Sequence, residues 1–369
     1  MRVLHVHSGN LYGGIETMLL ALVTFRRAAV GMEPRFALSF DGRISRELQD
    51  AGAQVDLLGP VRFSRPWTAW RARRRLAALI AADRPDVVIC HSDWSQALTG
   101  PIVQRARLPL VRWYHAPPTG KHWLERLARW SRPDFAVCNS DFTARAVAER
   151  DAEIPRATIR PAAAAPNLPP NARARTREQL GAHDDTIVIL QVGRLEPGKG
   201  HGALFQALVR LTDLPQWVVW EAGGAQRDVE VRYLGTLSLV AGQVGLANRV
   251  RFLGERTDTR SLYAAADIYC QPNTSPESYG LTFIEALYAG LPVVTSAIGG
   301  ANEIVDATCG VLVPPGDAGA LADALRRLIG DAAARRALGA PGPARATLLS
   351  DPAARVAELS EALTAWTVR

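Results

Sequence analysis

Two basic residues in the second half of the chain have types and a spacing suited to binding a phosphorylated ligand. Arg194 and Lys199 lie in the segment 191–200 (QVGRLEPGKG), which leaves a strand-like run, turns and enters a helix. A guanidinium and an ammonium beside a helix N-terminus would neutralise the roughly two negative charges of a diphosphate. Fixed donors of this kind also ease the departure of a nucleoside diphosphate. The alternative, two solvated surface cations, is disfavoured because Lys199 is one of only two lysines in the chain.

Two glutamates form a second pair, in the segment 272–286 (PNTSPESYGLTFIEA). Glu277 and Glu285 would lie ~12 Å apart if all the intervening residues were helical, so their carboxylates cannot share one proton. We expect them to contact two parts of one long ligand. Glu277, in a polar loop, would face the reacting end, and Glu285, inside the following helix, would accept hydrogen bonds from vicinal hydroxyls. The helix begins near Tyr279 or Gly280, and its N-terminus would face phosphates. The spacing alone also fits a loop glutamate and a solvated helix glutamate.

A third candidate is the turn 9–16 (GNLYGGIE) after the first strand-like run. Gly13 and Gly14 open a helix there, so a ligand could approach the backbone closely and an anion would meet free N–H groups. A tight turn without a ligand is the alternative. The turn is not G-x-G-x-x-G, which weakens a nicotinamide or flavin interpretation, and no Walker spacing supports ATP hydrolysis.

The elements that must position these residues alternate between short apolar runs and amphipathic helical stretches. That alternation predicts βαβ units and parallel sheets. The expected strands are 2–7, 35–40, 54–58, 86–90, 110–114 and 135–138, followed by 187–192, 217–221, 250–253, 268–271, 292–295 and 311–313.

A domain boundary is expected in the linker 161–171 (PAAAAPNLPPN), which carries four prolines and no periodicity. We therefore predict an N-terminal domain over 1–165, a second domain over 172–350, and a C-terminal helix over 351–369 that could pack back on the first domain. Two doubly wound domains would leave a cleft between them. Ligands of open parallel sheets bind beyond the carboxyl ends of the strands, so the site is expected in that cleft.

Composition narrows the function classes. The chain has 369 residues, 48% of them hydrophobic, and a net charge of +7, which excludes disorder and allows each half its own core. No apolar run approaches the ~18 residues of a membrane-spanning helix. The start, 1–8 (MRVLHVHS), reads as a buried strand rather than a signal peptide, so the cytoplasm is the expected compartment. No groove-reading motif appears, and we expect no nucleic-acid partner.

The motif segments resemble the family 4 retaining glycosyltransferases of GT-B fold. The resemblance rests on PESYGLTFIEALYAGLPVVTS, on GRLEPGKG upstream and on GGIE near the start. The E-x7-E signature of that family falls on Glu277 and Glu285, and its Arg/Lys pair on Arg194 and Lys199. The likeness is strong over 187–329 and looser in the first half. It implies two Rossmann-like doubly wound parallel-sheet domains facing a central cleft.

The resemblance also implies roles for individual residues. Arg194 and Lys199 would hold the diphosphate of a nucleotide-sugar donor, Glu277 its sugar and Glu285 its ribose. A histidine at the position of His115 faces the reacting sugar in many relatives, and we expect it to hydrogen-bond there, with a packed strand-end histidine as the alternative. Together with His115, the implied donor-binding and catalytic residues are Gly13, Gly14, Arg194, Lys199, Glu277, Tyr279, Gly280, Leu281 and Glu285. Relatives often have Phe where this chain has Tyr279.

The activity implied by the resemblance is transfer of a hexose-type sugar with retained anomeric configuration. The donor would be UDP- or GDP-linked and the acceptor a saccharide or a lipid-linked saccharide, in cell-surface glycan synthesis. Front-face attack aided by the leaving diphosphate needs no protein nucleophile, metal or other cofactor, and the absence of D-x-D agrees with this. A GT-B nucleotide-sugar epimerase, a phosphorylase-like enzyme and a non-catalytic sugar-binding protein are the alternatives.

The acceptor side of the sequence is less informative. Arginines surround tryptophans in 62–75 and 121–132, which suits peripheral contact with an anionic membrane at the inner face of the cell membrane and equally suits an ordinary solvated helix. His91, Ser92 and Asp93 follow a strand and could contact the acceptor, or form a turn with Asp93 as a helix cap.

Overall fold

The computed structural model describes residues 1–10, 13–225 and 227–367. Its chain divides into two units, Met1–Ala163 with Ser350–Arg369, and Ala164–Leu349. Each unit has its own parallel sheet and its own core, and each is described by itself below.

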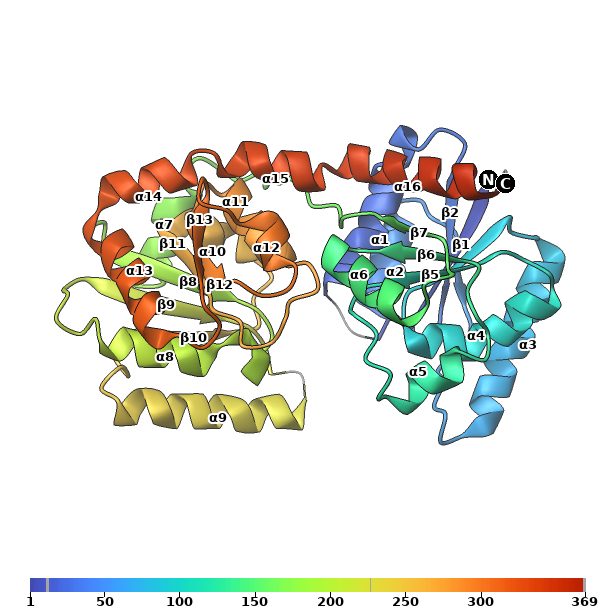
Figure 1. Ribbon diagram of the computed structural model, residues 1–369, viewed down its shortest axis with the longest axis horizontal. Helices are drawn as coiled ribbons and strands as arrows, with labels where there is room; N and C mark the ends of the chain where they lie inside the picture. Colours follow the sequence, from blue (N-terminus) through green and yellow to red (C-terminus); the bar gives the residue numbers. More distant parts are fainter. Residues whose placement is uncertain (11–12, 226, 368–369) are drawn as a thin grey trace. The chain divides into compact units, whose positions relative to one another are not determined.

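The first unit contains a seven-stranded parallel sheet in the order β3-β2-β1-β4-β5-β6-β7 (Figure 1). Its strands are β1 (Arg2–His7), β2 (Glu33–Leu38), β3 (Val55–Leu57), β4 (Val87–Cys90), β5 (Leu110–Tyr114), β6 (Phe135–Cys138) and β7 (Arg156–Thr158). Its helices are α1 (Gly14–Thr24), η1 (Arg26–Ala28), α2 (Arg43–Asp50), α3 (Pro66–Ala82), α4 (Asp93–Arg105), α5 (Trp123–Ala128), α6 (Asp141–Arg150) and α16 (Pro352–Thr367).

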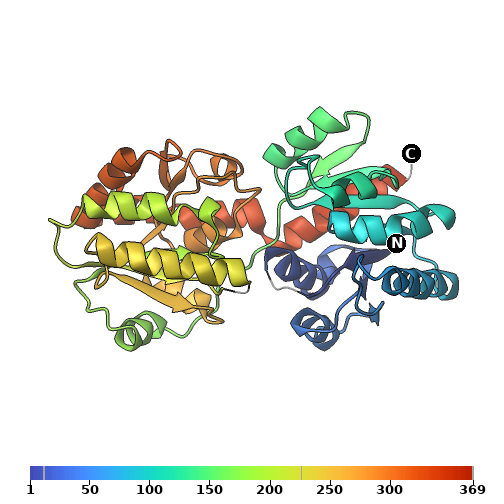
Figure 2. The same cartoon turned by 90° about the horizontal axis from the view of Figure 1, so that it is seen from below.

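The sheet of the first unit is buried on both faces, as a parallel sheet requires. Side chains of α1, α2 and α16 join the core on one face, and side chains of α3 and α4 join the core on the other. In Figure 2, α4 lies in the foreground of this unit and α16, in red, lies behind it. Helix α16 therefore belongs to this unit, although it is made from the last residues of the chain. Its Trp366 ring stacks on Phe135 with centroids 5.1 Å apart.

The second unit contains a six-stranded parallel sheet in the order β10-β9-β8-β11-β12-β13. Its strands are β8 (Ile187–Val192), β9 (Trp217–Ala222), β10 (Val250–Gly254), β11 (Ile268–Gln271), β12 (Val293–Ser296) and β13 (Gly310–Val313). Its helices are α7 (Ala172–Gln179), η2 (Pro197–Lys199), α8 (His201–Val209), α9 (Asp228–Gln243), α10 (Thr259–Ala265), α11 (Leu281–Tyr288), α12 (Ala301–Ile304), α13 (Ala318–Gly330) and α14 (Ala332–Gly339), followed by α15 (Gly342–Ser350).

The faces of the second sheet are covered by different helices. The main core joins the sheet to α8, α9 and α13. On the other face, Tyr269 of β11 contacts the rings of Tyr263 on α10 and Phe283 on α11. No helix among the described residues is both long and apolar enough to cross a membrane.

Two details differ from the expected elements. The strand β7 was not expected, because Arg156–Thr158 has only half-buried residues and no apolar run. The second detail is α15, a separate helix that precedes the expected C-terminal helix and begins at Gly342, within the Pro-Gly-Pro at 341–343. Pro343 falls in the first turn of that helix, where no intrahelical N–H is required.

Candidate active site

The strand order of the second sheet reverses between β8 and β11, and the predicted diphosphate-binding residues lie at that point. Strands β9 and β10 continue the sheet on one side, and β12 and β13 continue it on the other. The connections that leave β8 and β11 therefore diverge, and open α/β sheets bind their ligands at such a point, in the crevice outside the carboxyl ends of the strands. The loop 193–200 leaves β8 and the loop 272–280 leaves β11. Both predicted motifs are thus brought to one edge of the same sheet.

Backbone hydrogen bonds hold these two loops together. The N–H groups of Thr274 and Ser275 both donate to the carbonyl of Gly198, at 3.0 and 3.3 Å. Gly200 has φ +81°, and a Cβ there would lie 1.8 Å from the carbonyl oxygen of Pro272. Only glycine fits this close approach, so residue 200 fixes how the two loops meet.

Lys199 and Glu277 form an ion pair across the two loops. The Lys199 Nζ lies 2.5 Å from the Glu277 Oε2, and both side chains are about one-fifth exposed, at 19% and 21%. The Lys199 carbonyl accepts a hydrogen bond from Gln191 Nε2 at 3.0 Å. The Glu277 carbonyl accepts one from Gly300 N–H at 2.7 Å. Both charged residues are therefore anchored through their backbones, with their charged ends in contact and reachable from solvent.

Arg194 does not join this ion pair. Its side chain is 53% exposed, and its Nη1 lies 2.9 Å from Glu196 Oε1. The same oxygen accepts from Arg227 Nη2 at 2.9 Å. An exposed pair of this kind is worth ~0–1 kcal/mol, so Arg194 can leave Glu196 for a phosphate at little cost. Neither Glu196 nor Arg227 was singled out from the sequence, since nothing in the pattern shows which way a loop arginine turns.

Helix α11 starts where the second motif predicted it, with Gly280 at its N-terminus. Gly280 has φ +114°, and a Cβ there would lie 2.4 Å from the Phe283 ring. The next residue, Leu281, is half-buried. The Tyr279 side chain is buried, and its hydroxyl lies 3.5 Å from the Leu349 carbonyl, so any contact of Tyr279 with a ligand would come through its backbone.

Glu285 lies in the second turn of α11 and is half-buried. Burial raises the pKa of its carboxyl, while the Tyr263 hydroxyl and the charge of Arg260 act in the opposite direction. An ionised Glu285 carboxylate accepts hydrogen bonds and has no O–H group to donate. It therefore suits a ligand that brings hydroxyl groups.

A buried acid behind the first loop was missed in the sequence. Glu221 is at the carboxyl end of β9, and burial raises its pKa to about 8. The Nε2 of His201 lies 3.7 Å from its Oε2. Burial lowers the pKa of His201 to about 4. At neutral pH both groups are therefore uncharged behind the cationic loop. The one feature of the sequence that could have indicated Glu221 is a single glutamate at the end of an apolar, strand-like run.

In the first unit, the strand order reverses between β1 and β4, and the predicted glycine turn follows β1. Gly13 has extended backbone and precedes α1, whose first residue is Gly14. Two residues later Glu16 turns back to β1, and its Oε1 lies 2.7 Å from His7 Nε2 with both side chains buried. This pair fixes the start of α1. Residues 11 and 12 of the motif lie outside the described residues.

His115 is the last member of a series of histidines at the carboxyl edge of the first sheet. His5 Nδ1 lies 2.9 Å from His91 Nε2, and His91 Nδ1 lies 3.0 Å from His115 Nε2. Asn139 Nδ2 donates to the His115 carbonyl at 3.1 Å. The sequence singled out His115 and His91 separately, but it could not show that they touch.

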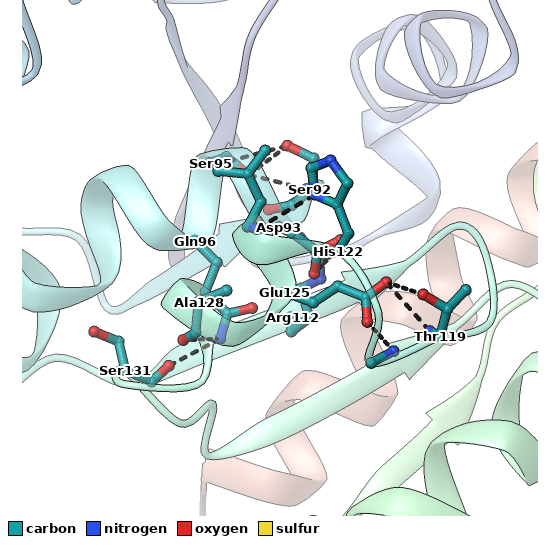
Figure 3. A network of polar contacts seen from close by, with 12 residues as sticks. Ser92, Asp93, Ser95, Gln96, Arg112, Thr119, His122, Glu125, Ala128 and Ser131 are labelled. Carbon is teal, nitrogen blue, oxygen red and sulfur yellow. Dashed lines mark hydrogen bonds and ion pairs between the residues drawn. The ribbon is translucent and has the colours of Figure 1, made fainter. Parts of the chain in front are cut away.

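The loop after His115 is held by a polar network (Figure 3). The Glu125 carboxylate accepts hydrogen bonds from the Thr119 N–H and hydroxyl, at 3.2 and 2.8 Å, and from the Gly120 N–H. Asp93 Oδ1 lies 3.1 Å from Arg112 Nη2. Asp93 is not the helix cap considered above. Ser92 caps α4, because its Oγ accepts from Ser95 N–H at 3.0 Å and Asp93 is already helical.

A cavity of about 460 Å³ lies beside this network, lined in part by Asp93, Tyr114, Glu125 and Arg150. Its lining combines acidic and basic side chains, so it could accept a polar ligand. Among the residues that the structure describes, no three His, Cys, Asp or Glu side chains gather into a group that could hold a metal ion.

Family models match each half of the chain. Residues 12–161 match the model described as Glycosyltransferase Family 4, and residues 172–345 match the model described as Glycosyl transferases group 1.

Two curated relatives show how the similarity is distributed. A D-inositol 3-phosphate glycosyltransferase of Xylanimonas cellulosilytica is 39% identical over 180 residues, 47% of this chain. That match covers 42% of the relative, so the chain spans less than half of its length. A lipopolysaccharide core biosynthesis glycosyltransferase, LpsD, of Rhizobium meliloti is 28% identical over 93% of this chain and 92% of the relative.

The fold has close counterparts among solved structures. Anabaena HepE in complex with UDP and glucose superposes with a TM-score of 0.86 over 99% of both chains, at 24% identity. At that identity the likeness shows the fold. With its two domains each matched by a glycosyltransferase model, the chain belongs to the family 4 glycosyltransferases, and its fold is GT-B.

Proposed function

We propose that the protein is a retaining, metal-independent hexosyltransferase that moves a sugar from a nucleotide diphosphate to a saccharide or lipid-linked acceptor. The Lys199–Glu277 ion pair, located where the strand order of the second sheet reverses, carries the proposal. A cation for a diphosphate and a carboxylate for sugar hydroxyls are in contact there, next to the start of α11.

The proposed chemistry needs no protein nucleophile. Lys199 and Arg194 bind the diphosphate and offset the charge that develops as the sugar leaves it. Glu277 accepts hydrogen bonds from the sugar, and Glu285 accepts them from the ribose. The bond from the sugar C1 to the diphosphate oxygen breaks, and the acceptor oxygen bonds to C1 on the same face. The acceptor proton passes to the departing diphosphate.

We extend the proposal to three residues of the first unit. Gly13 and Gly14 would offer backbone N–H groups to the diphosphate, and His115 would hydrogen-bond to the transferred sugar. The family resemblance supports these roles, and so does their position at the carboxyl edge of the first sheet.

Exposed tryptophans support a lipid-linked acceptor. Trp67, Trp70 and Trp123 are 48 to 58% exposed and Trp130 is 83% exposed. The Arg74 guanidinium lies over the Trp70 ring, 4.9 Å from its centroid. Exposed tryptophans among arginines are typical of surfaces that contact anionic lipid. We therefore propose a peripheral position on the cytoplasmic face of the membrane and a role in cell-surface glycan synthesis, the area named for the Rhizobium relative.

The donor is tested by calorimetric titration of the full chain with UDP- and GDP-hexoses. We expect one of these classes to bind with micromolar affinity, and Lys199→Ala to weaken it by ~10-fold or more, since hydrogen bonds to charged groups contribute ~1.5–3 kcal/mol. Lys121→Ala, which removes the other lysine, is the matched control and should leave donor binding unchanged. Equal affinity of Lys199→Ala and wild type would contradict the assignment.

The reaction is tested by product analysis with the donor that binds. We expect an α-linked product from an α-linked donor, formed at an undiminished rate with a metal chelator present. Product without any acceptor would identify an epimerase, and a strict need for free phosphate would identify a phosphorylase. Donor binding with no turnover on any saccharide or lipid-linked acceptor would favour a sugar-binding protein.

A further inference from the structure

Three imidazoles from three neighbouring strands form a continuous hydrogen-bonded row in the first unit. His5 lies on β1, and His91 and His115 directly follow β4 and β5, which are consecutive in the sheet. The ring centroids are 5.2 and 5.3 Å apart and the rings are tilted by only 24° and 20°. With N···N distances of 2.9 and 3.0 Å, the rings meet edge to edge, as two N–H···N bonds require.

The protons of this row can be counted. Burial lowers the pKa of His5 to about 3 and holds those of His91 and His115 well below the ordinary value. Each neutral ring carries one N–H, and each of the two contacts uses one proton. The third proton must therefore lie at one end of the row, on His5 Nε2 or on His115 Nδ1.

The two ends of the row are not equivalent. His5 Nε2 is buried and finds no hydrogen-bond partner among the residues that the structure describes. A proton there would be a buried N–H without an acceptor, and such donors are rarer in folded proteins than acceptors that lack a donor. His115 is half-buried, and its Nδ1 is not among the buried atoms without a partner. The third proton is therefore favoured on His115.

The surroundings keep the row neutral. Arg112 is buried beside it, and its charge further lowers the pKa values of His91 and His115. His7 approaches His91 edge-on, with ring centroids 6.2 Å apart, and its own Nε2 is bound to Glu16. Among the residues that the structure describes, the acid next to the row is Asp93, which is paired with Arg112 and has no hydrogen bond to the three rings. A positive charge on the row would thus lie beside a guanidinium and have no carboxylate as its own partner.

We propose that His5 and His91 are positioning residues that hold His115 as its Nδ1–H tautomer, so that His115 meets the substrate as a hydrogen-bond donor. The bonds then run from His5 Nδ1–H to His91 Nε2 and from His91 Nδ1–H to His115 Nε2. A neutral N–H donor fits a sugar oxygen and cannot accept a proton at Nδ1. The consequence for transfer rests on the role proposed above for His115, whereas the tautomer itself does not.

The tautomer is measured directly by long-range ¹H–¹⁵N correlation of imidazole nitrogens in the ligand-free full chain. We expect His115 to show a protonated Nδ1 and an unprotonated Nε2. His115→Gln assigns the signals by removing them, and the exposed His122 and His183 serve as internal references. A protonated Nε2 on His115 would overturn the proposal.

Two variants of His91 separate positioning from packing. His91→Asn keeps an amide that can donate from nearly the place of Nδ1, whereas His91→Phe keeps the ring and removes both hydrogen bonds. We expect His115 to remain Nδ1–H in His91→Asn and to become a tautomer mixture in His91→Phe. An unchanged His115 spectrum in a folded His91→Phe would contradict the proposal. If His91→Phe does not fold, the wild-type spectrum still decides between the two tautomers.

Kinetics give the second readout. We expect kcat to fall at least tenfold in His91→Phe and to recover most of its value in His91→Asn, with the Kd of the nucleoside diphosphate unchanged in both. Equal losses of kcat in the two variants would overturn the positioning role. A wild-type protein that shows the expected tautomer but transfers no sugar would refute the proposed function. The proton positions assigned to His5, His91 and His115 would still hold.

Discussion

The two sheets reverse their strand order in the same way, but the residues at the two reversals differ in kind. In the second unit the crevice between β8 and β11 holds charged side chains, with Lys199 paired to Glu277 and Arg194 paired to Glu196. In the first unit the corresponding edge holds neutral imidazoles, next to the His7–Glu16 and Arg112–Asp93 pairs. Topology thus brings the loops together in both units, and the residues after the central strands decide the chemistry. Charge suits a diphosphate, whereas directional neutral hydrogen bonds suit sugar hydroxyls.

The largest effect should come from removing the acid of the charged crevice. Glu277→Ala should lower transfer by ~10²- to 10³-fold, because the sugar loses its acceptor and Lys199 loses its partner. The fold should remain, since the Glu277 side chain is not in the core. Glu178→Gln, on an exposed face of α7, is the matched control. Full turnover by Glu277→Ala on the true substrates would refute the role assignment.

The next largest effect is expected at Gly200, where the backbones of the loops 193–200 and 272–280 approach each other closely. Gly200→Ala should destabilise the protein by ~2 kcal/mol or more and weaken donor binding, because its Cβ would lie 1.8 Å from Pro272 O. Gly202→Ala is the control, since nothing lies within 4 Å of a Cβ there and the residue is helical. Urea unfolding of both variants measures the difference. Comparable stability of the two would show that the loops do not depend on this close approach.

A third prediction concerns pH, and it has opposite signs in the two units. Between the ordinary glutamate pKa and about 8, Glu221 stays protonated in the folded chain but ionises in the unfolded one, so it lowers stability as pH rises. The stability of Glu221→Gln relative to wild type should therefore increase by ~3 kcal/mol from pH 5 to pH 8. Urea unfolding at both values measures this gain, and a pH-independent difference would contradict it.

The first unit should respond in the other direction. His5 is neutral in the folded chain down to about pH 3 but takes up a proton in the unfolded chain below its ordinary pKa of 6.5. Its neutral burial therefore lowers stability as pH falls from 6.5 towards 3. His5→Phe should reduce the acid sensitivity of unfolding between pH 6.5 and pH 4.5. If the free energy of unfolding of His5→Phe fell as steeply as that of wild type, or more steeply, between pH 6.5 and pH 4.5, the prediction would be contradicted.

The smallest effect is expected for Arg194. Arg194→Ala should weaken donor binding by only about tenfold, since the side chain is half-exposed and already solvated. Arg227→Ala is a close control, because Arg227 also pairs with Glu196 and is 52% exposed. Calorimetry should show a loss for Arg194→Ala alone. Equal losses of donor affinity in both variants would mean that the net positive charge of the region, rather than a contact made by Arg194, contributes to donor binding.

Much of the fold could be predicted from the sequence because buried parallel strands are continuous apolar runs. The runs at Ile187–Val192 and Ile268–Gln271 became the two strands that frame the charged crevice. From the sequence, Lys199 and Glu277 could be predicted to follow two strands of one sheet, but their contact could not be predicted. The strand order, which makes those two strands neighbours, cannot be read from the sequence.

What the sequence could not show has specific physical causes. The row of His5, His91 and His115 depends on the adjacency of β1, β4 and β5, and the spacings between the three residues carry no sign of it. The partner of Arg194 depends on the rotamer of a loop side chain. The alternative that made Asp93 the cap of α4 overlooked Ser92, because both residue types cap helices well and lie side by side.

The return of α16 to the first unit has a consequence for biosynthesis. Val356, Leu359 and Leu363 complete the core of a unit whose other residues end at Ala163. A ribosome releases every residue of the second unit before it releases these three. The unit that is synthesised first is therefore the last to close its core, and until then its nascent form needs protection from aggregation.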